Sequence, residues 1–166
     1  PGSTAHPIDT LGANLWNVFY RTGTLWTAQA ISGAHADAAW VHKLDVNSNP
    51  AVRLQTWDLE ASGDDTYFPY VMPDVNTDDF ALLSAFSGPS QYVTGRYWNV
   101  SAAGAVRYTE LTANGTQRNE SDRHGDFFSI ASDPLDRNRV WGIAQYMAQS
   151  TFTGNEEIVS VRFKDV

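Results

Sequence analysis

The length and rhythm of the apolar segments restrict the fold of this chain more than any other feature of its sequence. Apolar and polar residues alternate in short runs, such as 38–45 and 139–146, and turn-forming stretches such as 47–50 and 133–138 separate the runs. Alternation with a period of two, bounded by Gly, Pro, Asn and Asp, is typical of half-buried β-strands. No segment keeps an apolar stripe at the helical period for three turns. The sequence therefore predicts an all-β fold.

A longer periodicity groups these strands. Similar segments begin near Leu15, Tyr67 and Phe127, each with an aromatic-rich strand, a turn and a second apolar strand. Their spacing of roughly 50 to 60 residues is close to the ~40–50 residues of a four-stranded propeller blade, although a β-sandwich would show a similar pattern. We expect a β-propeller segment of about three to four four-stranded blades, an incomplete ring alone. The expected boundaries are a tail or linker at 1–10 and a propeller segment at 11–166, with blades near 11–57, 58–110 and 111–166.

Composition and charge exclude several classes of protein. The 166 residues carry a formal net charge of −8. A nucleic-acid binder needs a basic surface, so we expect no nucleic-acid partner. No run approaches the ~18 apolar residues of a membrane helix, so we expect no membrane partner. The chain has 0 cysteines, which removes disulfides, thiolate metal sites and cysteine nucleophiles.

One segment resembles a known family. Residues 123–134 read Arg-His-Gly-Asp-Phe-Phe-Ser-Ile-Ala-Ser-Asp-Pro, which resembles a signature of secreted sialidase-like propellers, the Asp-box or neuraminidase-repeat-like proteins. The chain departs from that signature at His124 and Phe127, where the family has Trp and Tyr, and at Gln145, where it has Glu. Shorter matches lie in family order along the chain, at 38–44, 67–69, 86–90, 94–96 and 140–146.

The Asp box itself is incomplete. Ser132 and Asp136 before Trp141 form at best a degenerate version of it. The resemblance implies that the chain is the C-terminal part of a longer, secreted propeller. Three blades do not close a ring, and an open arc exposes sheet edges and apolar faces. We therefore expect a second chain that completes the propeller, either a complementary fragment or another copy of this chain.

The resemblance also suggests where a ligand would bind. It places Asp126 at the start of an innermost strand, beside the central channel, with Arg123 and His124 close to it. Arg96 follows a glycine and could bind a carboxylate with both arms of its guanidinium. Tyr67 and Tyr146 complete the expected ligand-binding set. The alternative is purely structural, with Asp126 bonded to backbone N–H groups and Arg123 bracing adjacent blades.

The leading hypothesis is thus an extracellular propeller segment that assembles with a partner chain and binds a glycan or small polar ligand at the central channel. A two-chain glycoside hydrolase or polysaccharide lyase with a shared active site is the alternative, and a structural or adhesion propeller without a ligand site is another. A sialidase needs a Tyr–Glu nucleophile pair. Here Tyr146 stands beside Gln145, whose amide is neither a base nor a nucleophile. The catalytic residues therefore stay unassigned.

Metal and modification sites complete the expectations. The four histidines are scattered, and Asp74, Asn76 and Asp78 lack the Gly and Glu that an EF-hand loop requires. We expect no metal ligands and no cofactor, with a structural cation such as calcium left open. Three Asn-x-Ser/Thr sequons favour a secreted glycoprotein, although an ordinary polar loop explains them equally well. The sequon asparagines are Asn99, Asn114 and Asn119.

Overall fold

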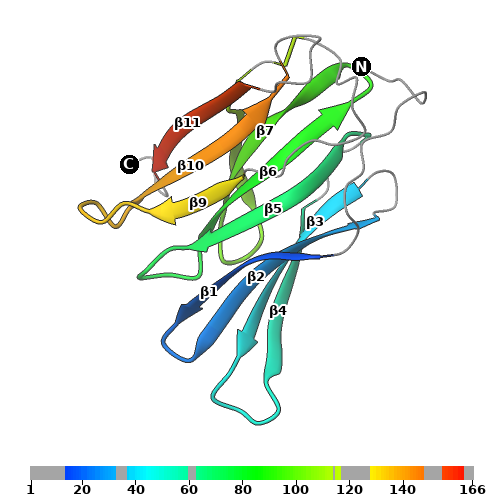
Figure 1. Ribbon diagram of the computed structural model, residues 1–166. Coiled ribbons are helices and arrows are strands. Elements are labelled where there is room, and N and C mark those ends of the chain that lie inside the picture. Colours follow the sequence, from blue (N-terminus) through cyan, green and yellow to red (C-terminus); the bar gives the residue numbers. More distant parts are fainter. Residues whose placement is uncertain are drawn as a thin grey trace.

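The computed structural model describes residues 14–32, 37–59, 63–113, 115–116 and 128–147, and the backbone of 155–162. Every regular element in these ranges is a β-strand, so the all-β prediction is confirmed for this part of the chain (Figure 1). No helix among the described residues has the length and hydropathy to cross a membrane. The strands are β1 (Leu15–Arg21), β2 (Thr24–Ser32), β3 (Asp37–Asp45), β4 (Val52–Leu59), β5 (Asp65–Pro73), β6 (Phe80–Gly88), β7 (Gln91–Val100), β8 (Val106–Leu111), β9 (Ser129–Ser132), β10 (Arg139–Tyr146) and β11 (Asn155–Arg162).

The strands form three antiparallel sheets in which each strand pairs with the next one along the chain. The first sheet has the order β1-β2-β3-β4, the second has the order β5-β6-β7-β8, and the third has the order β9-β10-β11. Tight turns allow strands that are consecutive in the sequence to pair with each other. The turn between β1 and β2 has only two residues, Thr22 and Gly23, and both have positive φ. A two-residue loop of that kind matches the twist of an antiparallel hairpin.

The second sheet is buried on both of its faces. Its strand β6 is an almost unbroken apolar run, because alternate side chains enter two different cores. Phe80 and Leu82 pack with Trp26, Val41 and Trp57 of the first sheet. The opposite face packs against the third sheet, and the residues of that second core include Ala81, Leu83, Ala85, Tyr97, Ile130, Val140 and Ala144.

Strand β5 joins the three sheets. It contacts β1, β2 and β3 of the first sheet and β9 of the third (Figure 1). Its pairing with β6 is interrupted between Tyr67 and Tyr70, and Phe68 within this bulge has a φ of 50°. The bulge directs the Phe68 ring against Trp16 of β1, edge to face at a centroid distance of 4.7 Å. An aromatic residue rarely adopts this backbone conformation, so the packing around it must hold it there.

Gly95 allows the second and third sheets to approach closely. A Cβ atom at this position of β7 would lie 2.7 Å from Thr112 Oγ1 and closer still to Ala144 Cβ of β10. Next to this point, the Met147 N–H donates to the Val93 carbonyl at 3.1 Å, which ties the end of β10 to β7. A residue without a side chain is therefore required for this packing.

Candidate functional site

The structure describes only some of the residues that the sequence put forward for a site. Arg123, His124 and Asp126 lie outside the described residues, as do the sequon asparagines Asn114 and Asn119. Arg96, Tyr67, Tyr146 and Asn99 are described. The expected convergence of Arg123, His124 and Asp126 therefore stays a prediction.

Tyr67 and Asn99 are both part of the core. The Tyr67 side chain is fully buried between the second and third sheets, and its hydroxyl donates to Ser87 Oγ at 3.3 Å. Burial raises the pKa of the Tyr67 phenol well above its usual value. Asn99 is 2% exposed, and its Oδ1 accepts a hydrogen bond from Arg107. Neither position fits its expected role, because a ligand or a glycan at these atoms would have to enter a packed interior.

Arg96 and Tyr146 lie on opposite sides of the second sheet. Arg96 of β7 is paired with Ser84 of β6, on the face that looks toward the first sheet. Tyr146 ends β10, in the third sheet, which covers the other face. Together with the buried Tyr67, these residues do not form one pocket, so the expected ligand-binding set does not converge in the described part of the chain.

Arg96 has an unusual environment for a charged side chain. Its guanidinium carbon lies 3.4 Å from the centroid of the Phe86 ring and 5.4 Å from that of Trp98. Its Nε atom is buried and has no hydrogen-bond partner among the described residues. The Ser84 hydroxyl, on the strand paired with β7, accepts a hydrogen bond from the Trp98 indole N–H at 3.1 Å.

Burial and a nearby carboxylate act on the Arg96 charge in opposite directions. Burial lowers the pKa of the guanidinium, and the nearby Asp64 carboxylate acts in the opposite direction. Stacking on aromatic rings offsets part of the desolvation of an arginine, but it leaves the N–H donors without acceptors. A carboxylate that reached this guanidinium would accept two parallel hydrogen bonds.

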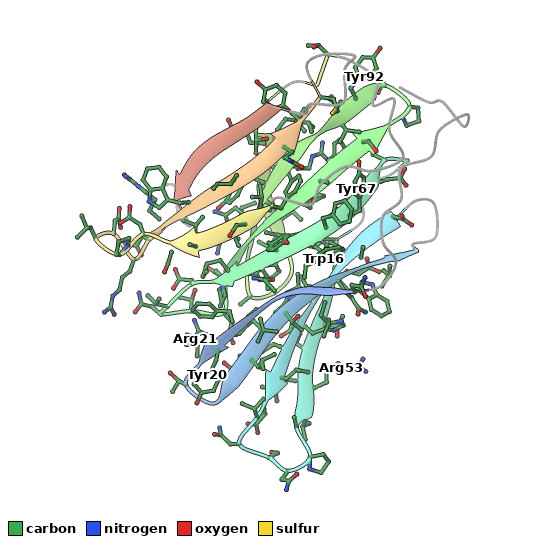
Figure 2. The ribbon with its side chains drawn as sticks, viewed as in Figure 1. Trp16, Tyr20, Arg21, Arg53, Tyr67 and Tyr92 are labelled. Carbon is green, nitrogen blue, oxygen red and sulfur yellow. The ribbon has the colours of Figure 1, made fainter. Side chains whose placement is uncertain are left out.

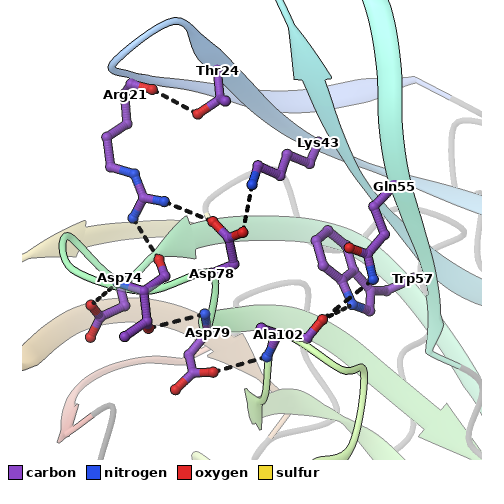
Figure 3. A network of polar contacts seen from close by, with 10 residues as sticks. Arg21, Thr24, Lys43, Gln55, Trp57, Asp74, Asp78, Asp79 and Ala102 are labelled. Atoms are coloured by element: carbon purple, nitrogen blue, oxygen red, sulfur yellow. Dashed lines mark hydrogen bonds and ion pairs between the residues drawn. The ribbon is translucent and has the colours of Figure 1, made fainter.

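Cations of the first sheet converge on the turn between β5 and β6 (Figure 3). Arg21 donates to the Thr77 carbonyl at 2.8 Å and to Asp78 Oδ1 at 3.0 Å, and Lys43 donates to Asp78 Oδ2 at 2.6 Å. Both cations also lie over the Trp26 ring, at 6.0 and 5.6 Å from its centroid. This cluster clamps the first sheet to the second.

The neighbouring carboxylates of the same turn satisfy backbone groups. Asp74 Oδ1 accepts the N–H groups of Asn76 and Thr77. Asp79 accepts the Ala102 N–H at 2.9 Å and an Arg107 N–H at 2.9 Å. The acidic run that resembles the start of a calcium loop thus has a structural use. No group of three or more metal-ligating side chains occurs among the described residues.

A second acidic turn lies between β9 and β10. Asp133 accepts the N–H groups of Leu135 and Asp136, and its other oxygen accepts the Trp141 indole N–H at 2.8 Å. These donors, the Leu135 N–H first, lower the pKa of the Asp133 carboxyl. The degenerate Asp-box pattern includes Asp136, whereas the aspartate that contacts the Trp141 indole is Asp133. A pattern of spacing alone does not show which of two aspartates in a turn faces the strand.

The outward faces of the first and third sheets carry exposed apolar side chains. Phe19 and Trp26, which lie opposite each other, point toward the second sheet, so their neighbours along β1 point away from it. Val18 and Tyr20 are 59% and 63% exposed on this outer face. Figure 2 shows Trp16 between the sheets, Tyr20 near the end of β1 beside Arg21, and Arg53 on β4.

The third sheet repeats this arrangement on β10. Val140 and Ala144 are buried toward the second sheet, whereas Trp141 and Ile143 are 41% and 38% exposed on the other face. Each of the two outer faces therefore has a row of large side chains that no described sheet covers. Apolar patches of this kind mark interaction surfaces in soluble proteins.

Comparison with known proteins identifies no relative. No family model matches the chain, no curated protein matches it, and no solved structure matches it. The resemblance to sialidase-like propellers therefore rests on the sequence motif alone.

Proposed function

We propose that this chain is a segment of a β-propeller that is completed by further antiparallel sheets from another polypeptide, and that the assembled ring binds a glycan or another small polar ligand. Its main role is then to supply consecutive sheets to the ring and to present loops around the channel. The observation that carries this proposal is the pair of apolar outer faces, on β1 and on β10, at the two ends of one stack of sheets.

The second sheet shows how this chain covers such faces. Both of its faces are closed by a neighbouring sheet, and its strand β6 is almost entirely apolar for that reason. The end sheets have one covered face each. Burying a large apolar side chain contributes about 1.5–3 kcal/mol, so a further sheet on each outer face would stabilise the stack substantially. Soluble proteins rarely leave such faces open.

Cysteine labelling tests this proposal, because the natural chain has 0 cysteines. Single substitutions Val18→Cys and Ile143→Cys place a thiol on each outer face, and Leu135→Cys places one in the β9–β10 turn, where Leu135 is 96% exposed. In the native assembly we expect a maleimide to react at positions 18 and 143 at least tenfold more slowly than at position 135. Equal rates at all three positions would show that the outer faces are open and would refute the proposal.

Arg96 favours an acidic ligand as the second part of this function. Its guanidinium is stacked on Phe86 and its buried Nε has no acceptor among the described residues, so a ligand carboxylate that reached this atom would supply the missing acceptor. A bidentate pair of this type is geometrically selective, and a neutral sugar lacks the group that it needs. The test probes are therefore glucuronate and glucose, which differ in this carboxylate.

Ligand-observed NMR with both sugars provides the measurement. We expect the native assembly to bind glucuronate in preference to glucose, and Arg96→Gln to weaken glucuronate binding at least tenfold. Arg53→Gln is the matched control, because Arg53 is an exposed arginine at the far end of the first sheet (Figure 2). Equal binding of both sugars, or equal loss in both variants, would contradict a carboxylate site at Arg96.

A further inference from the structure

A carboxylate next to Arg96 narrows the ligand of the proposed site. Arg96 lies over the ring of Phe86 on β6, and the Asp64 carboxylate packs against Gly88 of the same strand. We propose that Asp64 is a specificity-determining residue of this site, and that it selects an acid with hydroxyl groups next to its carboxylate, as in a uronic acid. This inference rests on the proposed function, in which Arg96 binds a carboxylate, and it adds a second contact and the substrate class.

The pairing of β5 with β6 brings Asp64 to this place. In this antiparallel pair Thr66 is opposite Phe86. Two residues further along, Asp64 comes level with Gly88 on the same face of the sheet. A Cβ atom at Gly88 would lie 2.7 Å from the Asp64 carboxyl carbon and closer still to its Oδ1. The Asp64 carboxylate therefore occupies the space that a side chain at position 88 would fill, and only glycine leaves that space free.

Arg96 comes to the same face from β7. It is paired with Ser84, which lies two residues before Phe86 on β6. Because its guanidinium carbon is 3.4 Å from the centroid of the Phe86 ring, the side chain extends along β6 toward Gly88. Burial lowers the pKa of the Arg96 guanidinium and Asp64 opposes that shift, as a carboxylate close to a cation does. Both side chains belong to partly exposed residues, so the two charges meet where solvent has access.

The charge of Asp64 is not used by the ion pairs of the fold. Asp64 takes part in none of the ion pairs that join described residues. This separates it from Asp78 and Asp79, which pair with cations, and from Asp133, whose oxygens accept N–H groups of its own turn and of an indole. A partly exposed carboxylate of this kind can accept hydrogen bonds from a ligand.

Two opposite charges side by side make different demands on a ligand. A ligand carboxylate accepts hydrogen bonds from Arg96, whose buried Nε has no acceptor among the described residues. The same carboxylate is repelled by Asp64, which only accepts hydrogen bonds. A ligand gains from both side chains if it also carries O–H donors beside its carboxylate. A uronic acid does, because a hydroxyl group occupies the ring carbon next to the one that bears the carboxylate. A simple carboxylic acid lacks that donor, and a neutral sugar lacks the carboxylate.

The ratio of two affinities tests this inference. Glucuronate and cyclohexanecarboxylate are both six-membered rings with one carboxylate, but only glucuronate has hydroxyl groups. The contact with Arg96 and the repulsion by Asp64 are common to both acids, so the ratio reports the contribution of the hydroxyl groups. By ligand-observed NMR on the native assembly, we expect the wild type to prefer glucuronate and Asp64→Ala to reduce that preference about tenfold. Asp58→Ala is the matched control, because Asp58 is exposed on β4 between Trp57 and Leu59, which point toward the second sheet.

Gly88→Ala gives an independent test and separates the inference from the proposed function. Its methyl group displaces the Asp64 carboxylate without changing any charge, so we expect the same loss of preference. Far-UV circular dichroism on each variant checks that the fold is retained. An unchanged preference for glucuronate in Asp64→Ala or Gly88→Ala refutes the inference, as does a wild type that binds both acids equally. If Arg96→Gln still weakens the binding of both acids, the proposed carboxylate site stands without Asp64. If Arg96→Gln weakens neither, both fail.

Discussion

Gly95 offers a direct test of how the second and third sheets pack. We predict that Gly95→Ala lowers the free energy of unfolding by about 1–2 kcal/mol. The added methyl group would lie 2.7 Å from Thr112 Oγ1 and closer to Ala144 Cβ, well inside van der Waals contact. Overpacking of this kind costs about 1–3 kcal/mol. The lower backbone entropy of alanine in the unfolded chain offsets about 0.5–1 kcal/mol of that cost.

A reciprocal substitution on β10 shows whether the clash with Ala144 is the cause. Ala144→Gly alone removes a buried methyl group, worth about 0.8 kcal/mol, and adds a flexible residue to a strand, which costs a further ~0.5–1 kcal/mol. The double variant moves the methyl group from one sheet to the other. We expect its destabilisation to be about 1 kcal/mol less than the two single effects added together.

Urea unfolding followed by tryptophan fluorescence and by far-UV circular dichroism measures these free energies. The two signals should give the same midpoint, which justifies two-state treatment. A Gly95→Ala variant as stable as the wild type would show that the sheets are not in close contact at this point. Strictly additive single effects would show that the residues at 95 and 144 do not meet.

Further predictions concern the acidic turns and the buried tyrosine. Asp79→Ala should cost about 2–4 kcal/mol in urea unfolding, because Asp79 is nearly buried and accepts charge-assisted hydrogen bonds. Asp78→Ala should cost only about 1 kcal/mol, since its side chain is 40% exposed. A larger loss of stability in Asp78→Ala than in Asp79→Ala would contradict this prediction. Donors to Asp133 hold its pKa below the unfolded value. The contribution of this carboxylate to folding stability is therefore complete above about pH 4 and is lost as pH falls through the folded pKa. Asp133→Asn should reduce the acid sensitivity of the melting temperature. The same decrease of the melting temperature at acidic pH in the variant and the wild type would contradict this. The raised pKa of Tyr67 predicts that this phenol ionises in an ultraviolet titration only on alkaline unfolding, and that its contribution to stability falls as pH rises above about 10. Tyr67→Phe should remove that late-titrating signal.

The all-β fold was predictable because it depends on local patterns. Alternation along residues 38–45 and the turn residues around 47–50 specify strands and their ends without reference to the rest of the chain. The burial of β6 on both faces agrees with its almost unbroken apolar run. The bulge in β5 was not predictable, because it is held by Trp16, a residue 52 positions away from Phe68.

The candidate site was less predictable than the fold. A conspicuous residue type at the start of a strand suggested a ligand role for Tyr67, but which face of the strand it occupies depends on the bulge beside it. Arg96 was put forward from the sequence, whereas its stacking on Phe86 depends on the register between β6 and β7. The clamp of Arg21 and Lys43 on Asp78 joins positions that no short motif connects.

The burial of β6 on both faces has a consequence for the dynamics of the molecule. Its amides are bonded to β5 and β7, and both of its faces are covered by other sheets. Water can reach them only when the entire stack opens, so hydrogen–deuterium exchange along 80–88 should report the free energy of global unfolding. The amide exchange rates of this central strand would then provide the reference for global unfolding, against which the earlier opening of the peripheral strands can be measured.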